Sequence, residues 1–149
     1  MKFLSIIFIA IISYATNIEI LAKHFEYNQT SNISIFTGDV NVTKGNDNIL
    51  SDTLYVYTTN QKKLAKIIAI GHVKFKVTDK NSTYKGKSDK LTYIASKQLF
   101  VFEGNVNIIK LDDNQQLFGD KVIINKKEGS ANITGSSNKP IKFILKVKE

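Results

Sequence analysis

Apolar and polar residues alternate with a period of two along most of the chain after residue 15. Around Gly38, for example, Phe36, Val40 and Val42 fall in one phase of the alternation, and the residues between them are polar. Successive side chains of a β-strand point to opposite faces of the sheet, so this period is typical of strands with one apolar face. No segment after residue 15 combines a 3.6-residue period with helix caps. The pattern therefore predicts an all-β protein with almost no helix.

A glycine-centred motif recurs about every 33 residues. It reads FTGDV around Gly38, AIGHV around Gly71, FEGNV around Gly104 and, more weakly, ITG at Gly135, so that the glycines are 33, 33 and 31 residues apart. Each glycine lies inside a strand pattern and not in a turn, where glycine usually marks a bulge or a sharp bend. Turn-forming residues separate the strand patterns. We therefore predict an elongated structure of repeated, bent strands that encloses an apolar interior.

A second motif lies between successive glycines and consists of an aspartate followed two residues later by an aliphatic residue. It occurs at Asp52, Asp89 and Asp120. A single catalytic site does not need three copies of one carboxylate, so we interpret these aspartates as structural residues that begin strands. The adjacent Asp112 and Asp113 precede Asn114 and Gln115, and we interpret that pair as part of a hairpin turn.

The N-terminus has the three parts of a secretory signal peptide in their usual order. Lys2 is followed by residues 3–12 (FLSIIFIAII), which are apolar apart from Ser5, and Ser13 and Ala15 are small residues suited to a cleavage site. We predict a signal peptide of residues 1–15 and a single mature domain of residues 16–149. An uncleaved anchor is the alternative, although about 20 apolar residues are needed to span a bilayer.

The polar composition restricts the function more than the fold. The chain has 21 lysines, no arginine, no cysteine, two histidines and a formal net charge of +8. These counts exclude disulfides, cysteine zinc sites, thiol nucleophiles and multi-histidine metal sites. We predict no metal and no cofactor. A cysteine-free secreted domain suits a bacterial envelope better than an animal secretory pathway.

No motif in the chain points to catalysis. The sequence contains neither a G-x-S-x-G elbow nor a phosphate-binding glycine loop. His24 and His72 are interpreted as solvated side chains, and His72 falls in the outward phase beside Gly71. The lysines are dispersed, and arginine, the usual bidentate partner of guanine and phosphate, is absent. We therefore predict a protein that is not an enzyme and does not bind nucleic acid.

With these motifs in this order, the sequence resembles the LptA/OstA family of periplasmic lipopolysaccharide-transport proteins. The resemblance covers about residues 18–135. It rests on ordered segments: residues 35–45 (IFTGDVNVTKG), 51–54 (SDTL), 84–93 (YKGKSDKLTY), 102–106 (FEGNV) and 118–122 (FGDKV). The resemblance implies a twisted β-jellyroll, folded like a taco shell, with an apolar groove for the acyl chains of lipopolysaccharide. It also implies a periplasmic location and a head-to-tail homo-oligomer that links LptC-like inner-membrane and LptD-like outer-membrane proteins.

The inward phase of the alternation supplies the candidate groove. An apolar fold of this kind suits acyl chains, because burying one methylene contributes about 0.8 kcal/mol without any catalytic group. Ordinary core packing is the alternative role of each of these residues. The candidate lipid-binding residues are Phe36, Val40, Val42, Leu54, Val73, Phe75, Leu91, Tyr93, Phe102, Val106, Ile108 and Val122.

The two ends of the chain supply a candidate assembly edge. Residues 141–147 (IKFILKV) alternate as a last strand, and a last strand leaves unpaired backbone groups at the edge of a sheet. Ile18 and Ile20 are the matching candidates at the other end, and Ile141, Phe143 and Leu145 complete the set. Pairing within the chain is the alternative. The chain departs from the family at both ends: residues 18–23 have Leu21-Ala22-Lys23 in place of the acidic step seen in many members, and the C-terminal tail is short.

Three other functions remain open from the sequence. A β-helix carbohydrate-active enzyme would need far more repeats and a cluster of carboxylates across neighbouring rungs. A membrane-anchored LptC-like component of the same pathway would share the fold and keep the N-terminal segment. A secreted polysaccharide-binding β-solenoid would expose aromatic residues, and Tyr55, Tyr57 and Tyr84 are the candidates for such exposure.

Overall fold

The computed structural model describes residues 18–79, 82–136 and 138–145, and within them the chain forms ten strands and one short 3-10 turn. The predicted signal peptide, residues 1–15, lies outside these described residues. The elements are β1 (Ile18–Leu21), β2 (His24–Asn28), β3 (Ile33–Lys44), β4 (Asp47–Thr58), β5 (Leu64–Asp79), β6 (Ser82–Ile94), η1 (Ala95–Lys97), β7 (Leu99–Lys110), β8 (Gln115–Asn125), β9 (Ser130–Thr134) and β10 (Lys142–Ile144). The all-β prediction is confirmed.

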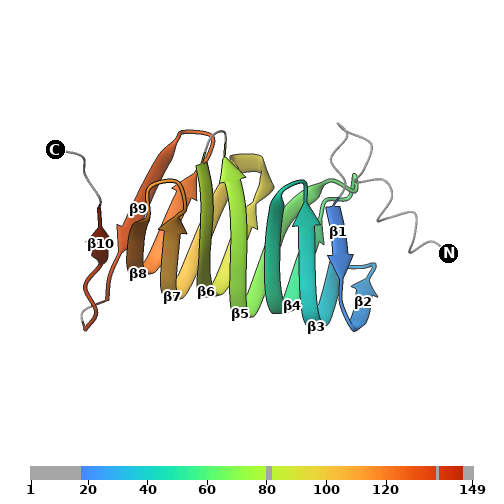
Figure 1. The fold of residues 1–149 in the computed structure, drawn as a ribbon. Helices are drawn as coiled ribbons and strands as arrows, with labels where there is room; N and C mark the ends of the chain where they lie inside the picture. The colour runs from blue at the N-terminus through green and yellow to red at the C-terminus, as the bar shows by residue number, and fades with distance from the viewer. Residues whose placement is uncertain (1–17, 80–81, 137, 146–149) are drawn as a thin grey trace.

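All strands belong to one antiparallel sheet in the order β1-β3-β4-β5-β6-β7-β8-β10, in which β2 also pairs with β3 and β9 with β8. Each long strand bends near its middle, so that the sheet folds over along its whole length (Figure 1). We name the two halves by their residues. The first limb contains residues 24–28, 33–37, 53–58, 64–70, 90–94, 99–103, 121–125 and 130–134, and the second limb contains residues 18–21, 40–44, 47–51, 73–79, 82–88, 106–110, 115–119 and 142–144.

The bend between the limbs, here called the crease, lies at the recurrent glycines. Gly38, Gly71 and Gly104 have φ angles of +85°, +89° and +82°. The residue after each glycine also has a positive φ, and the strand register shifts at each of these pairs. Glycine adopts this backbone without the steric cost of a Cβ. The predicted bend is confirmed in three repeats, whereas β9 ends at Thr134 and Gly135 makes no further crease.

The aspartates of the second motif also lie at the crease, so the interpretation that they begin strands is wrong. Asp52 and Asp89 lie in the middle of β4 and β6 and reach over the glycines of the next strand. The Asp52 carboxylate lies 2.7 Å from Nδ1 of His72, and Asp89 accepts a hydrogen bond from the Asn105 amide at 3.0 Å. His72 is 89% exposed, as predicted, and its bond to Asp52 raises the pKa of the imidazole above its ordinary value.

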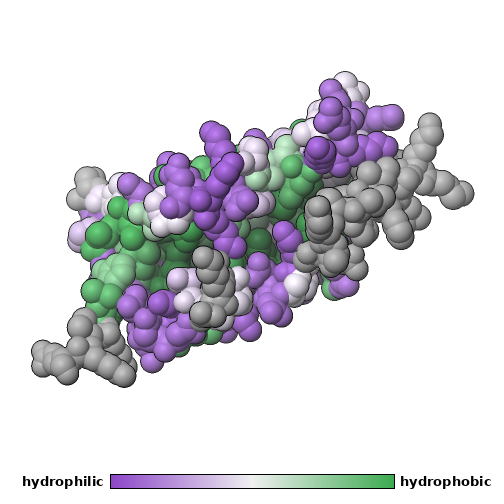
Figure 2. Space-filling view, turned by 90° about the horizontal axis from the view of Figure 1, so that it is seen from above, coloured by the Kyte–Doolittle hydropathy of each residue, from purple (hydrophilic) through white to green (hydrophobic). Residues whose placement is uncertain are grey.

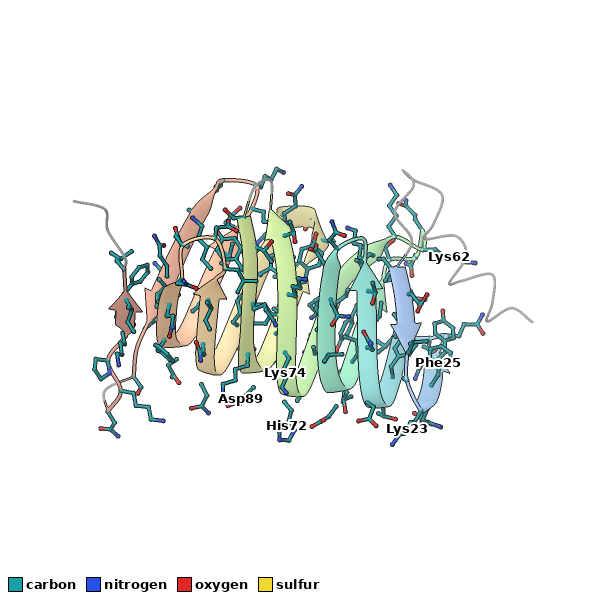
Figure 3. The ribbon with its side chains drawn as sticks, in the orientation of Figure 1. Lys23, Phe25, Lys62, His72, Lys74 and Asp89 are labelled. Carbon is teal, nitrogen blue, oxygen red and sulfur yellow. The ribbon has the colours of Figure 1, made fainter. Side chains whose placement is uncertain are left out.

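The first crease uses the same contact with the charges reversed. The side chain of Lys23 lies over Gly38, and its ammonium lies 3.0 Å from the carboxylate of Asp39, the residue after the glycine. Lys23, His72 and Asp89 all lie along the lower edge of the molecule in Figure 3. This arrangement explains why residues 21–23 lack the acidic residue seen in many family members. Here Lys23 covers Gly38, and the acidic partner is Asp39, which follows that glycine.

Gly71 is expected to be far less tolerant of alanine than Gly45. A Cβ on Gly71 would collide with the Asp52 side chain, whereas a Cβ on Gly45, whose φ is +59°, would meet nothing within 4 Å. Left-handed backbone costs a non-glycine residue about 1–2 kcal/mol, so Gly45→Ala should lower the free energy of unfolding by about that amount. Gly71→Ala should lower it by about 3 kcal/mol, because displacement of Asp52 adds to the backbone strain. Equal losses in urea unfolding of the two variants would contradict this account of the crease.

The inner faces of the limbs carry rows of apolar side chains that run from strand to strand. One row of the first limb consists of Phe25, Phe36, Leu54, Ala69, Leu91, Phe102, Val122 and Ile133. The central row of the second limb consists of Ile20, Val42, Ile49, Phe75, Gly86, Ile108, Leu117 and Phe143. Burial of these two rows against each other makes the hydrophobic core.

Candidate functional site

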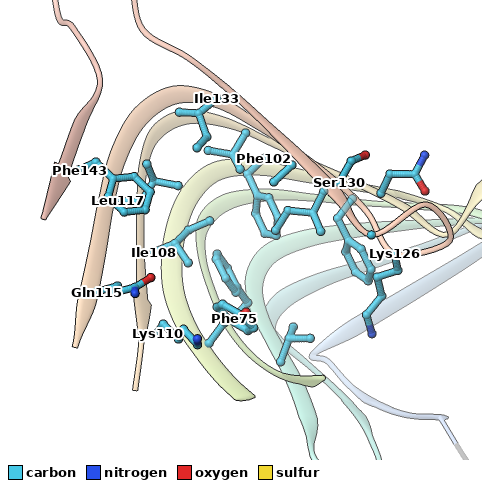
Figure 4. A pocket seen from close by; sticks show the side chains of 18 of the residues that line it. Phe75, Phe102, Ile108, Lys110, Gln115, Leu117, Lys126, Ser130, Ile133 and Phe143 are labelled. Atoms are coloured by element: carbon cyan, nitrogen blue, oxygen red, sulfur yellow. The ribbon is translucent and has the colours of Figure 1, made fainter. Parts of the chain in front are cut away.

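An apolar cleft lies between the two limbs, opposite the crease. Figure 2 looks into it from above and shows hydrophobic residues along the middle with hydrophilic residues on both sides. A cavity of about 380 Å³ occupies the part of the cleft nearest β9 and β10. Its apolar lining includes Phe75, Phe102, Ile108, Leu117, Ile124 and Ile133 (Figure 4). This volume lies at the lower end of the range of about 300–1,000 Å³ for ligand pockets.

Aromatic rings close the cleft beside this cavity. The ring centroids of Phe75, from the second limb, and Phe102, from the first, lie 4.5 Å apart. Phe100 continues the contact on the first limb, with its ring 6.3 Å from that of Phe102 and 4.6 Å from that of Tyr93. Gly86 leaves room for Phe75, because a Cβ at that position would lie 2.5 Å from Cζ of the ring. The open space therefore begins where the contact between Phe75 and Phe102 ends.

The structure divides the buried residues of the predicted groove into three groups. Those nearest the crease are almost fully buried and make its packed floor: Val40, Leu54, Val73, Leu91 and Val106. Phe75, Phe102, Ile108 and Val122 are also buried, but they line the cavity. Phe36 and Val42 are buried in the core away from this cavity.

One predicted residue is less enclosed than the sequence suggests. Tyr93 is half-buried, which raises the pKa of its hydroxyl, and Ala69 is fully buried instead. Several residues that line the cavity were absent from the predicted set: Val77, Tyr84, Phe100, Leu117, Ile124 and Ile133. All of them share the inward phase, so the same alternation could have identified them. Tyr84 thus faces inward, whereas Tyr55 and Tyr57 alternate with inward Leu54 and Val56 and face outward.

The two rims of the cleft differ in charge. The loops at the rim of the first limb carry Lys62, Lys63, Lys97, Lys126 and Lys127, with Glu128 as their one acidic residue. At the rim of the second limb, Lys110 lies 3.3 Å from the carboxylate of Asp113, and this hydrogen bond raises the pKa of Lys110. Lys126 lines the cavity and holds its ammonium 5.7 Å from the centroid of Phe100. A cation at the mouth of an apolar cavity suits an amphipathic anion.

The predicted assembly edge lies at the two ends of the sheet, at opposite ends of the molecule (Figure 1). Ile18 and Ile20 of β1 pack against the core. The backbone of β1, and not these side chains, is therefore the part available for pairing with another copy. At the other end, Ile141, Phe143 and Leu145 are 46%, 48% and 55% exposed. The predicted last strand, residues 141–147, is shorter in the structure: β10 pairs with β8 through Lys142–Ile144, and residues 146–149 lie outside the described part of the chain.

The two end strands, β1 and β10, have the directions and the inner faces that pairing between two copies would need. Because all neighbouring strands are antiparallel, β10 of one copy beside β1 of another would continue the alternation of strand directions. Ile20 and Phe143 belong to the same inner row as Phe75 and Ile108, so such a contact would also continue the apolar cleft. The first limb has the same property through β2 and β9.

Other kinds of site find no support in the described part of the chain. No group of three His, Cys, Asp or Glu side chains there is arranged to hold a metal ion. None of its helical segments has the length and hydrophobicity needed to cross a membrane.

Comparisons with known proteins identify a family model and a solved structure that are similar to this chain. Residues 19–130 match the model of the family described as LptA/(LptD N-terminal domain) LPS transport protein. Among solved structures, the fold is similar to that of LptH from Pseudomonas aeruginosa, described as the LptA homologous periplasmic component of the lipopolysaccharide transport device. The TM-score is 0.75 at 14% sequence identity, and the alignment covers 87% of this chain and 95% of LptH. No curated protein sequence matches the chain significantly.

Proposed function

The chain belongs to the family of LptA and the LptD N-terminal domain, which are lipopolysaccharide transport proteins, and we propose that its cleft carries the acyl chains of lipid A. The predicted resemblance to the LptA/OstA family and the predicted jellyroll-like fold are both confirmed. The family and the fold are those of a transport protein and not of an enzyme.

The main observation in support of this proposal is that two rows of apolar side chains face each other across an open cavity. Phe102, Val122 and Ile133 approach from the first limb, and Phe75 and Ile108 approach from the second. Removal of methylenes from water contributes about 25 cal/mol per Å² of apolar area, so a chain laid between these rows is held without hydrogen bonds. Apolar contacts of this kind do not require one fixed chain length, which suits acyl chains that differ in length.

The headgroup of the lipid would remain at the rim. Lys126 stands at the mouth of the cavity, and Lys127 follows it in the same loop. A lysine ammonium on a flexible stem acts as a mobile point charge, which suits the phosphates of lipid A in more than one position. The rim of the second limb is less basic because Lys110 is paired with Asp113. This difference supports a position of the phosphates on the first-limb side.

Transport between membranes would use the two ends of the sheet. A contact between different surfaces of two identical subunits does not close on itself and produces a filament. In such a filament β10 of one copy would pair with β1 of the next, and the cleft would run through both. The ends of the filament would meet LptC-like and LptD-like proteins in the periplasm. We propose that residues 1–15 are a cleaved signal peptide that directs the chain to the periplasm, whereas retention of this segment as an anchor would favour the LptC-like form.

Ile124→Trp is expected to weaken lipopolysaccharide binding, whereas Ile123→Trp is not. Ile124 lines the cavity, and its neighbour on β8 faces the outside of the same limb. An indole in the cavity would displace at least two methylenes of the ligand, which corresponds to a loss of about tenfold in affinity. Titration of purified protein with fluorescent lipopolysaccharide would measure both constants. Equal affinities for the two variants would overturn the proposal that the cleft binds the lipid.

A further inference from the structure

The outer face of the second limb carries a square of four lysines. Lys74 lies directly opposite Lys87 on the neighbouring strand, and Lys76 lies directly opposite Lys85. All four side chains are exposed. Side chains in such cross-strand pairs are about 5 Å apart at Cβ, and the two pairs are separated by about 7 Å along the strands. Four positive charges thus share a small area of β5 and β6.

Nothing within the described part of the chain neutralises this square. The ion pairs found there involve Lys23, Lys90, Lys110 and Lys121 and the two histidines, but none of the four lysines of the square. Like charges directly opposite each other destabilise a sheet. An anionic partner would therefore remove a repulsion as well as add an attraction.

Apolar side chains border the lysines on both sides. Leu50 lies beside Lys74 on β4, and Ile109 lies beside Lys85 on β7. Leu50 is 38% exposed and Leu111, just beyond β7, is 43% exposed. These residues and the lysines surround a shallow hollow on the outside of the limb, separate from the cleft. Lysines interspersed with exposed aliphatic residues are typical of surfaces that lie on a membrane.

We infer that this outer face binds the surface of an anionic phospholipid bilayer. The lysines would contact headgroup phosphates, and Leu50, Ile109 and Leu111 would enter the boundary between headgroups and acyl chains. A bilayer suits the site better than a protein, because its phosphates are mobile and lysine, unlike arginine, does not demand a fixed bidentate geometry. This inference goes beyond the proposed function, since it concerns the outside of the limb and not the cleft.

The test is sedimentation of the purified protein with vesicles that contain no lipopolysaccharide. Vesicles of phosphatidylglycerol and phosphatidylethanolamine should bind the protein at low salt, and vesicles of phosphatidylcholine should not. Replacing Lys74, Lys76, Lys85 and Lys87 by glutamine should weaken binding by at least about tenfold, because basic residues near an anionic surface each contribute to the attraction. Replacing Lys66, Lys90, Lys121 and Lys139 by glutamine removes the same charge outside the square and outside the rim loops, and should change binding by less than about threefold.

Two further variants separate the contribution of the outer face from the effects of net charge and of the cleft. Leu50→Ser with Leu111→Ser should also weaken binding to anionic vesicles, although the net charge is unchanged. Ile124→Trp should bind vesicles as the wild type does, because the cleft takes no part. Equal losses in the two quadruple variants, or failure of the wild type to bind anionic vesicles, would overturn the inference. Binding of the wild type to phosphatidylcholine as strongly as to phosphatidylglycerol would overturn it as well.

Discussion

Replacing Phe102 by alanine is expected to lower the free energy of unfolding by about 3–5 kcal/mol, the usual cost of removing a buried aromatic ring. Phe102 is 2% exposed, and its ring joins the two limbs through Phe75 at a centroid distance of 4.5 Å. The sheet has little core apart from the contact between its two inner faces. The loss is therefore a large part of the about 5–15 kcal/mol by which a typical domain is stable.

Phe118 provides the matched control for this change. It lies on β8, next to β7, but on the outer face, where its ring is 5.8 Å from the ammonium of Lys142. Phe118→Ala should cost less than about 1.5 kcal/mol, because the removed ring is not enclosed by the core. Urea unfolding followed by circular dichroism measures both values. Similar losses for Phe102→Ala and Phe118→Ala would mean that the limbs are not held together by their inner rows.

A double variant with cysteines at Glu19 and Ile144 is expected to form a ladder of disulfide-linked oligomers on mild oxidation. The natural chain has no cysteine, so each new bond can be assigned. Glu19 and Ile144 lie on the outer face in one row that crosses all eight strands of the second limb, from β1 to β10. If β10 of one copy pairs with β1 of the next in that row, their Cα atoms come within about 4.5–5.5 Å, which a disulfide can bridge.

The control places the second cysteine on the other face of the same strand. Phe143 precedes Ile144 and lines the cavity, so a cysteine there would point away from Glu19. The pair Leu21 and Lys142 shares the other outer row and should behave like Glu19 and Ile144. Non-reducing gels after oxidation would separate these cases. Equal ladders from the Glu19/Phe143 and Glu19/Ile144 variants would contradict pairing through these edges.

Alternation alone located nearly all of the core. Eleven of the twelve predicted groove residues are buried, because a strand with one covered face leaves little freedom in which residues point inward. The exception shows the limit of the rule. Tyr93 has the right phase, but it stays half-buried beside Phe100, whereas Ala69 is fully buried. Phase determines which face a residue occupies, and only the packing of the neighbouring strands determines how deeply it is buried.

The role of the polar residues could not be predicted in the same way. Asp52 and Asp89 were recognised as a repeated structural feature, but their positions over Gly71 and Gly104 depend on the register between strands. At the first crease Lys23 and Asp39 take the place of such a contact. This too can be recognised only when the pairing of β3 with the segment before it is known. The lysine square also arises from register, since its members come from two strands and look dispersed in the sequence.

Site-specific photo-crosslinking of lipopolysaccharide tests the central claim most directly. A photoreactive phenylalanine analogue would replace Phe75 or Phe102 on the inner faces, and Ile68 or Glu103, which lie on the same two strands, on the outer faces. With purified protein and lipopolysaccharide in the absence of vesicles, the account predicts strong labelling at Phe75 and Phe102 and much weaker labelling at Ile68 and Glu103. Equal labelling of the inner and outer positions would contradict the claim that the cleft between the limbs carries the acyl chains.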